Sequence, residues 1–537
     1  MKQKDDQKVA QIKIGLLSIL LLLGTYSGIM GCGGSGSGSS SVSAQSITTS
    51  LGDMTVGSVA DIPFGSAGSA KITFSNLTGR EQFIVSFQAH TTSSGTYSTG
   101  ITGSESLLGE SLQSSLMASR ISKIDEEPSS DPMEATETFH EFLRAEEANL
   151  PIPSQSLRLS MSGGGGSLRE SVSAGDSLSV KVLNSLSSTS SYSTITCQVR
   201  VVTSHFIACR DSSSSSLSDS NLSTLMTNFE AQANTEYSTY GSVSDIDGNG
   251  KVIVVFSPVL NSLGGSGGIV TGYFFAGDLY PNSYASSNGG EYLFCHVPDG
   301  TISTSFYMSN TGPNCMPHEL QHAINYNMRV FQNSTSSEPG AHNEGLSHLA
   351  EHVFGNNNEN PSRVNLYFGT NLASFTGGTS LSQRGGSYLF YRYIYEQANN
   401  GRFSGLANGT AFLSSMLNRS QTGLDAVAAA TGENINTLLS DFLTTLYLSN
   451  TGLSTNSRYN FSGINLRASQ DDNRGTVLDG PTVKTASSLP VSGSVLATSS
   501  NYTMVTGAQI QSAGNSLSLS ASSSSSPYAS LIRIGDR

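Results

Sequence analysis

The residues best suited to chemistry in this sequence are the five that run His318-Glu319-Leu320-Gln321-His322. On a helix, positions four apart lie on one face, so the imidazoles of His318 and His322 could bind one metal ion. Glu319 would then face the open position of the ion and act as a general base toward a water molecule held there. The chemistry indicated is hydrolysis at zinc, which lowers the pKa of its water and polarises a carbonyl.

The neighbouring residues favour histidines that point into the protein. Pro317 stands directly before His318, and Ala323 and Ile324 continue an apolar face. Two buried neutral histidines beside a glutamate are costly unless something pairs with them, and a metal ion meets that need. The alternative is an amphipathic helix that keeps both histidines in water.

A third ligand has to come from another helix. The metzincin extension of the motif needs a glycine at 325 and a histidine at 328, whereas this chain has Asn325 and Met328, so that class is excluded. Glu344 follows His322 after 21 intervening residues, enough for the chain to leave one helix and return antiparallel on a second. Glu344 is therefore the predicted third ligand. The alternative is that it is a solvated helix carboxylate.

Other side chains on the second helix could support the metal ligands. Glu344, His348 and Glu351 have the spacing i, i+4 and i+7, which places them on one helical face. His348 or Glu351 could hold the free N–H of a ligand imidazole. His342 and His352 are weaker candidates for the metal itself.

These residues resemble the gluzincin metallopeptidases, of which thermolysin is the familiar type, and more closely the hyicolysin family. The resemblance implies a zinc endopeptidase that acts on protein or peptide substrates, with Glu319 as the catalytic residue. It implies His318, His322 and Glu344 as the zinc ligands. The segments that carry it are 318–322, 343–347, 245–252, 272–278 and 385–390, within a similar stretch of about 178–450.

Two parts of the expected site stay open. Thermolysin-like enzymes carry an aspartate four residues after the ligand glutamate, and here that place is taken by His348. The residue that orients a ligand imidazole is therefore not settled between His348 and Glu351. An oxyanion donor should also exist. The candidates are tyrosines that could equally be packing aromatics: Tyr326, Tyr367, Tyr388 and Tyr391.

A second motif, at 245–250, places oxygen ligands at alternate positions around glycine, as calcium loops do. Its candidate ligands are Asp245, Asp247 and Asn249. The bidentate glutamate of such loops is missing, because Phe256 stands at the twelfth place. The alternative is an Asp/Gly/Asn turn that leads into a strand.

The N-terminus has the pattern of an export signal. A lysine-rich start precedes an apolar segment, 14–23, that is too short to span a membrane. Ile29-Met30-Gly31-Cys32 then resembles a bacterial lipoprotein box, in which Cys32 would carry the lipid and anchor the chain in a membrane. Gly33 in place of aspartate favours the outer membrane or cell surface. The alternative is an ordinary signal peptide cleaved nearby.

Four cysteines remain besides Cys32, and an even number suggests two disulfides in an oxidising compartment. Three pairings are open. We favour Cys197 with Cys209, which would close a hairpin-like loop. We also favour Cys295 with Cys315, which would tie the motif helix to the segment before it. The alternative is free buried thiols.

Composition and charge narrow the classes of partner. Only 12% of the residues are charged, about half the usual share, and the net charge is -13. Lysine and arginine do not cluster beyond the N-terminus, so a nucleic-acid partner is not expected. Glycine, serine and threonine take the place of the missing charges, a pattern common in exported β-rich proteins.

Periodicity predicts an α+β multidomain chain with small β-rich modules on both sides of a central region. The family resemblance implies that this central region is a gluzincin-type catalytic domain. The predicted divisions are a signal peptide (1–31), a Gly/Ser tether (32–50), a β-rich module (51–120), an acidic linker with a helix (121–177), a zinc metallopeptidase domain (178–455) and a C-terminal β-rich module (456–537). Strands are expected at 70–74, 83–87, 179–182, 195–207, 251–257, 292–294 and 530–534, and helices at 138–150, 217–240, 313–331, 342–355, 384–399, 422–430 and 434–448.

Other functions fit the same residues. A non-enzymatic surface lipoprotein, such as an adhesin or scaffold, would hold a structural or degenerate zinc site closed by four protein ligands. Glu319 argues against it, because a structural site has no use for that carboxylate. A metal-dependent hydrolase of non-peptide substrates would share the site. A latent form is a further hypothesis, because segment 121–160 contains an acidic helix with His140 that could act as an inhibitory prosegment.

Overall fold

The computed structural model describes residues 46–103, 134–153, 172–265, 268–280, 283–469 and 475–537. The predicted signal peptide, the lipidation residue Cys32 and most of the predicted tether lie outside these ranges. The end of that tether does not: strand β1 (Ile47–Leu51) begins inside it. No helix in the described part of the chain is long and apolar enough to cross a bilayer.

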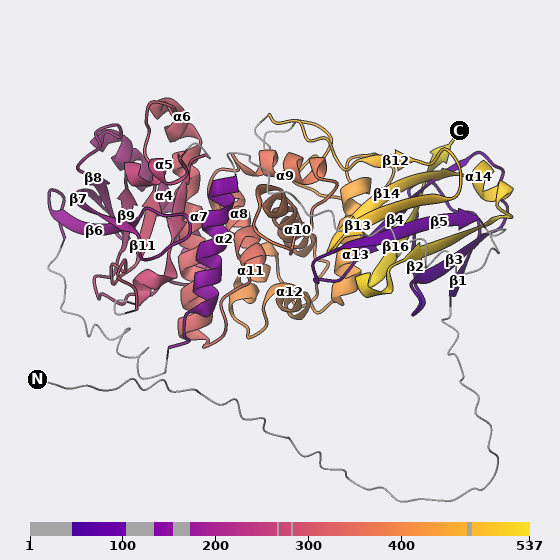
Figure 1. The fold of residues 1–537 in the computed structure, drawn as a ribbon, viewed down its shortest axis with the longest axis horizontal. Helices are drawn as coiled ribbons and strands as arrows, with labels where there is room; N and C mark the ends of the chain where they lie inside the picture. The colour runs from indigo at the N-terminus through magenta and orange to yellow at the C-terminus, as the bar shows by residue number, and fades with distance from the viewer. Residues whose placement is uncertain (1–45, 104–133, 154–171, 266–267, 281–282, 470–474) are drawn as a thin grey trace, which may run out of the picture. The chain divides into compact units, whose positions relative to one another are not determined.

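Two five-stranded sheets combine strands from both ends of the chain, and Figure 1 shows the indigo and yellow strands side by side. The order of one sheet is β1-β3-β15-β5-β13, and that of the other is β12-β14-β4-β16-β2. The modules predicted at 51–120 and 456–537 are therefore not separate units. The remaining strands are β2 (Val59–Pro63), β3 (Ser69–Phe74), β4 (Glu81–Ala89), β5 (Thr96–Gly103), β12 (Val483–Thr485), β13 (Val491–Leu496), β14 (Ser499–Thr506), β15 (Ser516–Ala521) and β16 (Pro527–Asp536).

The physical reason for this union is a shared core. Every second residue of β3 is buried, as the period of two predicts. Ile72 and Phe83 from the N-terminal strands belong to the same apolar cluster as Leu517 and Leu531 from the C-terminal strands. Neither half could bury its apolar face alone, so each half covers the other.

A six-stranded sheet of order β10-β11-β9-β8-β7-β6 forms the centre of the region that carries the HELQH motif. Alternate residues of β9 enter different clusters: Ile253 and Val255 face one side, and Val252 and Val254 face the other. The sheet is thus buried on both faces, and β10 lies at its edge. The strands are β6 (Ser177–Leu183), β7 (Tyr192–Val202), β8 (Phe206–Asp211), β9 (Val252–Phe256), β10 (Gly272–Phe274) and β11 (Tyr292–Cys295).

One predicted strand is corrected by the structure. The run 195–207 is not continuous but divides into β7 and β8, an antiparallel hairpin. The chain turns at Thr203, whose N–H donates to Phe206 O, so the apolar residues on either side belong to two strands. Both favoured disulfides are confirmed: Cys197–Cys209 joins this hairpin, and Cys295–Cys315 joins β11 to the motif helix.

Helices make up most of the rest and give the described chain a mixed α/β structure, consistent with the predicted α+β class. The motif lies on α7 (Thr311–Tyr326), which continues into a π-helical segment at Asn327–Gln332. Five of the helices, α5, α6, α9, α11 and α14, were not predicted. The others are α2 (Glu134–Asn149), α4 (Asp219–Tyr240), α5 (Pro258–Leu263), α6 (Thr304–Ser309), α8 (Gly340–Phe354), α9 (Asn360–Gly369), α10 (Leu381–Asn399), α11 (Gly409–Leu417), α12 (Gly423–Thr431), α13 (Ile435–Leu448) and α14 (Gly507–Ser512).

The shared sandwich makes a testable prediction. Leu517 is fully buried on β15, opposite Ile72 of β3 and Gly103 of β5. Leu517→Ala should lower the free energy of unfolding by about 2–5 kcal/mol and expose 46–103 to proteolysis. The exposed Ser520 on the same strand gives the control Ser520→Ala, which should change neither property. If 46–103 stays protected in a destabilised Leu517→Ala, the two ends fold independently.

Candidate metal centre

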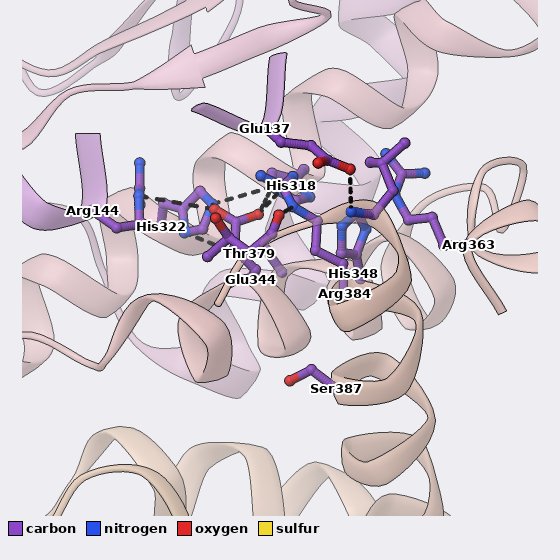
Figure 2. A network of polar contacts seen from close by, with 12 residues as sticks. Glu137, Arg144, His318, His322, Glu344, His348, Arg363, Thr379, Arg384 and Ser387 are labelled. Atoms are coloured by element: carbon purple, nitrogen blue, oxygen red, sulfur yellow. Dashed lines mark hydrogen bonds and ion pairs between the residues drawn. The ribbon is translucent and has the colours of Figure 1, made fainter. Parts of the chain in front are cut away.

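Three predicted ligands converge between α7 and α8. His318 Nε2 lies 3.1 Å from His322 Nε2 and 3.3 Å from Glu344 Oε2, and His322 Nε2 lies 3.5 Å from Glu344 Oε1. Figure 2 shows the three side chains pointing at one another. All three are buried, Glu344 completely. Two imidazole nitrogens and a carboxylate gathered around one point fit the donor set that zinc takes.

The Nδ1 atom of each imidazole, on the ring edge away from the centre, contacts a side chain of α8. His318 Nδ1 lies 2.6 Å from Glu351 Oε1, and His322 Nδ1 lies 3.0 Å from Ser347 Oγ. Each ring therefore has its Nδ1 engaged, which leaves Nε2 directed at the common point. Glu351 contacts a ligand directly, whereas His348 contacts Glu351 at 2.8 Å. Ser347 was not predicted, although its place three residues after Glu344 puts it on the same helical face.

The protonation of the histidine pair follows from these contacts. Burial lowers the pKa of His318, but its hydrogen bonds with Glu344 and Glu351 outweigh burial and raise the pKa to about 10. Burial, with the nearby Arg144 charge, holds the pKa of His322 well below its usual value. A proton on one Nε2 can then be donated to the other Nε2, at 3.1 Å. A metal ion would have to displace that proton.

Glu319 faces the sheet side of the centre. Its Oε2 accepts a hydrogen bond of 2.7 Å from the backbone N–H of Phe274 on β10. Burial raises the pKa of Glu319 to about 7, against the opposing charges of His318 and Arg144. The carboxylate is thus placed next to the three ligands without being one of the converging group, with a proton affinity suited to proton transfer near neutral pH.

Two buried arginines complete the surroundings of Glu344, and neither was predicted. Arg384 Nη1 lies 3.0 Å from Glu344 Oε2, and Arg144 Nε lies 3.9 Å from Glu344 Oε1. Burial raises the pKa of Glu344, but Arg384 and the two histidines outweigh it, so the pKa falls well below the ordinary value. The carboxylate is therefore charged despite its complete burial.

Close packing of α10 on α8 positions Arg384. A side chain at Gly345 would meet Ser387 Oγ at 2.2 Å, so the glycine permits this approach. Ser387 Oγ then donates to Ala341 O at 2.8 Å, which fixes α10 against the first turn of α8. The 385–390 segment was noted in the sequence only for its resemblance, and its packing role explains its small residues.

Other candidate residues take part in contacts of their own. His342 Nδ1 lies 2.9 Å from Tyr391 Oη, and His352 Nδ1 lies 3.3 Å from Arg392 Nη1. Tyr326 bonds to Tyr280 through their hydroxyls at 3.0 Å. Among the remaining candidates for an oxyanion donor, Tyr388 Oη accepts from Arg392, and the hydroxyl of Tyr367 is buried without a hydrogen bond among the described residues.

The 245–250 loop pairs largely with its own backbone. Asp247 Oδ1 accepts from Asn249 N–H at 3.1 Å, and Asn249 Oδ1 accepts from Lys251 N–H at 2.6 Å. Asp245 and Asp247 each bring an oxygen within 4.8 Å of the buried Glu291, which precedes β11. A calcium ion at this loop stays a prediction.

The chain is similar to a neutral metalloprotease, ShpI of Staphylococcus hyicus, with 25% identity over 175 residues. The match spans 30% of this chain and 39% of that protein. No protein-family profile matches the chain. The similarity and the buried group of His318, His322 and Glu344 together fit a metallopeptidase in general.

The contacts behind the ligands can be tested through metal affinity. Glu351→Gln and Ser347→Ala should each weaken zinc binding by about 10–100-fold, because the ligand ring loses the partner that orients it. Competition with a chromophoric chelator measures this. Glu433→Gln is the matched control, since Glu433 pairs with Arg402 rather than with a group of the centre and should leave affinity unchanged. Unchanged affinity in Glu351→Gln would remove that residue from the metal centre.

Proposed function

We propose that this protein is a zinc-dependent endopeptidase. The observation that carries the proposal is the convergence of His318, His322 and Glu344 in a dry interior with Glu319 beside them. The similarity to a neutral metalloprotease supports the same activity class. The motif segments, including Asn343–Ser347 and 385–390, support a gluzincin-type site of the hyicolysin kind.

A zinc ion bound by these three residues would polarise a peptide carbonyl and lower the pKa of a water molecule. Glu319 would take a proton from that water and return it to the departing amine. Its hydrogen bond to Phe274 N–H holds the carboxylate in position. Glu351 and Ser347 keep the two ligand rings oriented through the cycle.

The edge strand β10 supports a polypeptide substrate. Phe274 directs its N–H and its carbonyl away from β11, toward the centre, where both bond to side chains. An extended peptide could add to such an edge through its own backbone once the contact of Arg144 to Phe274 O is released. Such binding is indifferent to most side chains, as suits an enzyme that cuts within polypeptides.

We further propose that the enzyme is exported and held in a membrane by a lipid on Cys32. The support is the pattern of the N-terminal sequence and the two disulfides, which form and persist in oxidising compartments. Mass spectrometry of the mature N-terminus would identify the lipid. A mature chain that begins elsewhere, without acylation, would replace this proposal with simple secretion.

The peptidase is tested by Glu319→Gln. This change should retain about one zinc per chain and lower kcat/KM on a protein substrate by about 10²–10⁴-fold, because the general base is lost. Metal content and cleavage rate are measured on the same samples, with chelator-treated wild type as the reference. Zinc retained together with undiminished cleavage would exclude this mechanism. If wild type retains zinc but cleaves no substrate, even under conditions that would relieve a latent form, the alternative of a non-enzymatic surface lipoprotein is favoured.

A further inference from the structure

Helix α2 lies across the candidate centre. It runs beside α7 and α8 in Figure 1, and Figure 2 shows its Arg144 next to the ligand group. Two helical rows are buried. Phe139 and Leu143 enter the apolar cluster on one face of the six-stranded sheet, while His140, Arg144 and Glu147, spaced i, i+4 and i+7, face the centre.

One set of α2 contacts covers the open edge of the sheet. Arg144 Nη2 donates to Phe274 O at 3.1 Å, and Glu147 Oε1 accepts from Ala276 N–H at 3.4 Å. Arg144 and Glu147 also pair with each other at 3.1 Å. These are backbone groups that an extended peptide would need for pairing with β10. Helix α2 therefore occupies backbone groups to which a substrate would hydrogen-bond. Its own peptide bonds are helical rather than extended, so it does not present one for cleavage.

A second set of contacts reaches the opposite side of the centre. Glu137 Oε1 accepts from Leu381 N–H at 2.6 Å at the start of α10. The side chain of Arg144 also packs against Gly340 at the start of α8. Helix α2 thus bridges the sheet edge and the helices that carry Glu344 and Arg384.

The consequence is a closed centre. His318 is 6% exposed, Glu319 2%, and Glu344 not at all. A polypeptide cannot bring its backbone to a group that is buried in this way. Arg144 also places a second positive charge 3.9 Å from Glu344, where the charge of a metal ion would act. Helix α2 therefore blocks the approach of a substrate and also competes with a metal ion for the carboxylate of Glu344.

We propose that α2 is an internal inhibitor, which keeps the protein latent by occupying the substrate-binding edge of β10. The proposal rests on the peptidase function proposed above and concerns its regulation. Activity requires α2 to leave its place beside β10.

The experiment releases α2 in the full-length protein. Leu143→Asp places a charge in the apolar cluster, and Arg144→Ala removes the bond to Phe274 O. Each should raise the rate of cleavage of an unstructured protein substrate at least tenfold over wild type. Leu143→Asp should also speed the removal of zinc by a chelator, because it exposes the centre, and this readout needs no substrate. Thermal unfolding checks that the variants are folded, and Arg144→Ala decides if Leu143→Asp is not.

Two controls separate this inference from the proposed function. Glu141 lies on the exposed side of α2, so Glu141→Ala should behave as wild type. Glu319→Gln combined with Arg144→Ala should abolish the gained activity. Wild type that cleaves as fast as Arg144→Ala overturns the inhibition and leaves the peptidase standing. Zinc-loaded, folded variants that cleave nothing overturn the peptidase itself.

Discussion

The packing of α7 against α8 is the contact on which the rest of the site depends. It brings Glu344 into a dry interior opposite two histidines, where a lone carboxylate would be very costly. The charge is tolerated because Arg384, Arg144 and the protonated His318 surround it. Because Gly345 has no side chain, α10 packs close to α8 and brings Arg384 to Glu344. The charge of Glu344 on α8 therefore constrains the sequence of α10.

The electrostatic arrangement is that of a site prepared for a cation. Buried ion groups contribute little stability by themselves, because desolvation offsets their attraction. A divalent ion held by His318, His322 and Glu344 would replace part of this positive charge, and His318 would bind it through an unprotonated Nε2. The stability of this region then comes from other features: the sheet buried on both faces, the Cys295–Cys315 disulfide next to α7, and the helices packed against α7. Function and stability are carried by different parts of this region.

Residue spacing in the sequence predicted those features of the site that depend on helix geometry alone. The four-residue spacing of His318 and His322, and the position of Glu344 on a second helix, follow from helical periodicity, and the structure brings these residues together. Arg384 and Arg144 could not be predicted, because each reaches the centre from an element whose placement depends on tertiary packing. The sandwich shows the same limit. A period of two in β3 predicts that one face is buried, but it says nothing of which strand lies beside it, and that strand is β15, at the other end of the chain.

The sharing of both sheets between the two chain ends has a consequence for synthesis. About 380 residues separate the end of β5 from the start of β12, and a ribosome needs about 20–75 s to make them at 5–20 residues per second. During that interval β4 and β5 lack both neighbouring strands and β3 lacks β15, so their edges are open to association with other chains. The region between them must therefore fold, or be kept apart, before the sandwich can close. Strand β4 is covered on both sides only when β16 arrives, because its two neighbours in the sheet are β14 and β16.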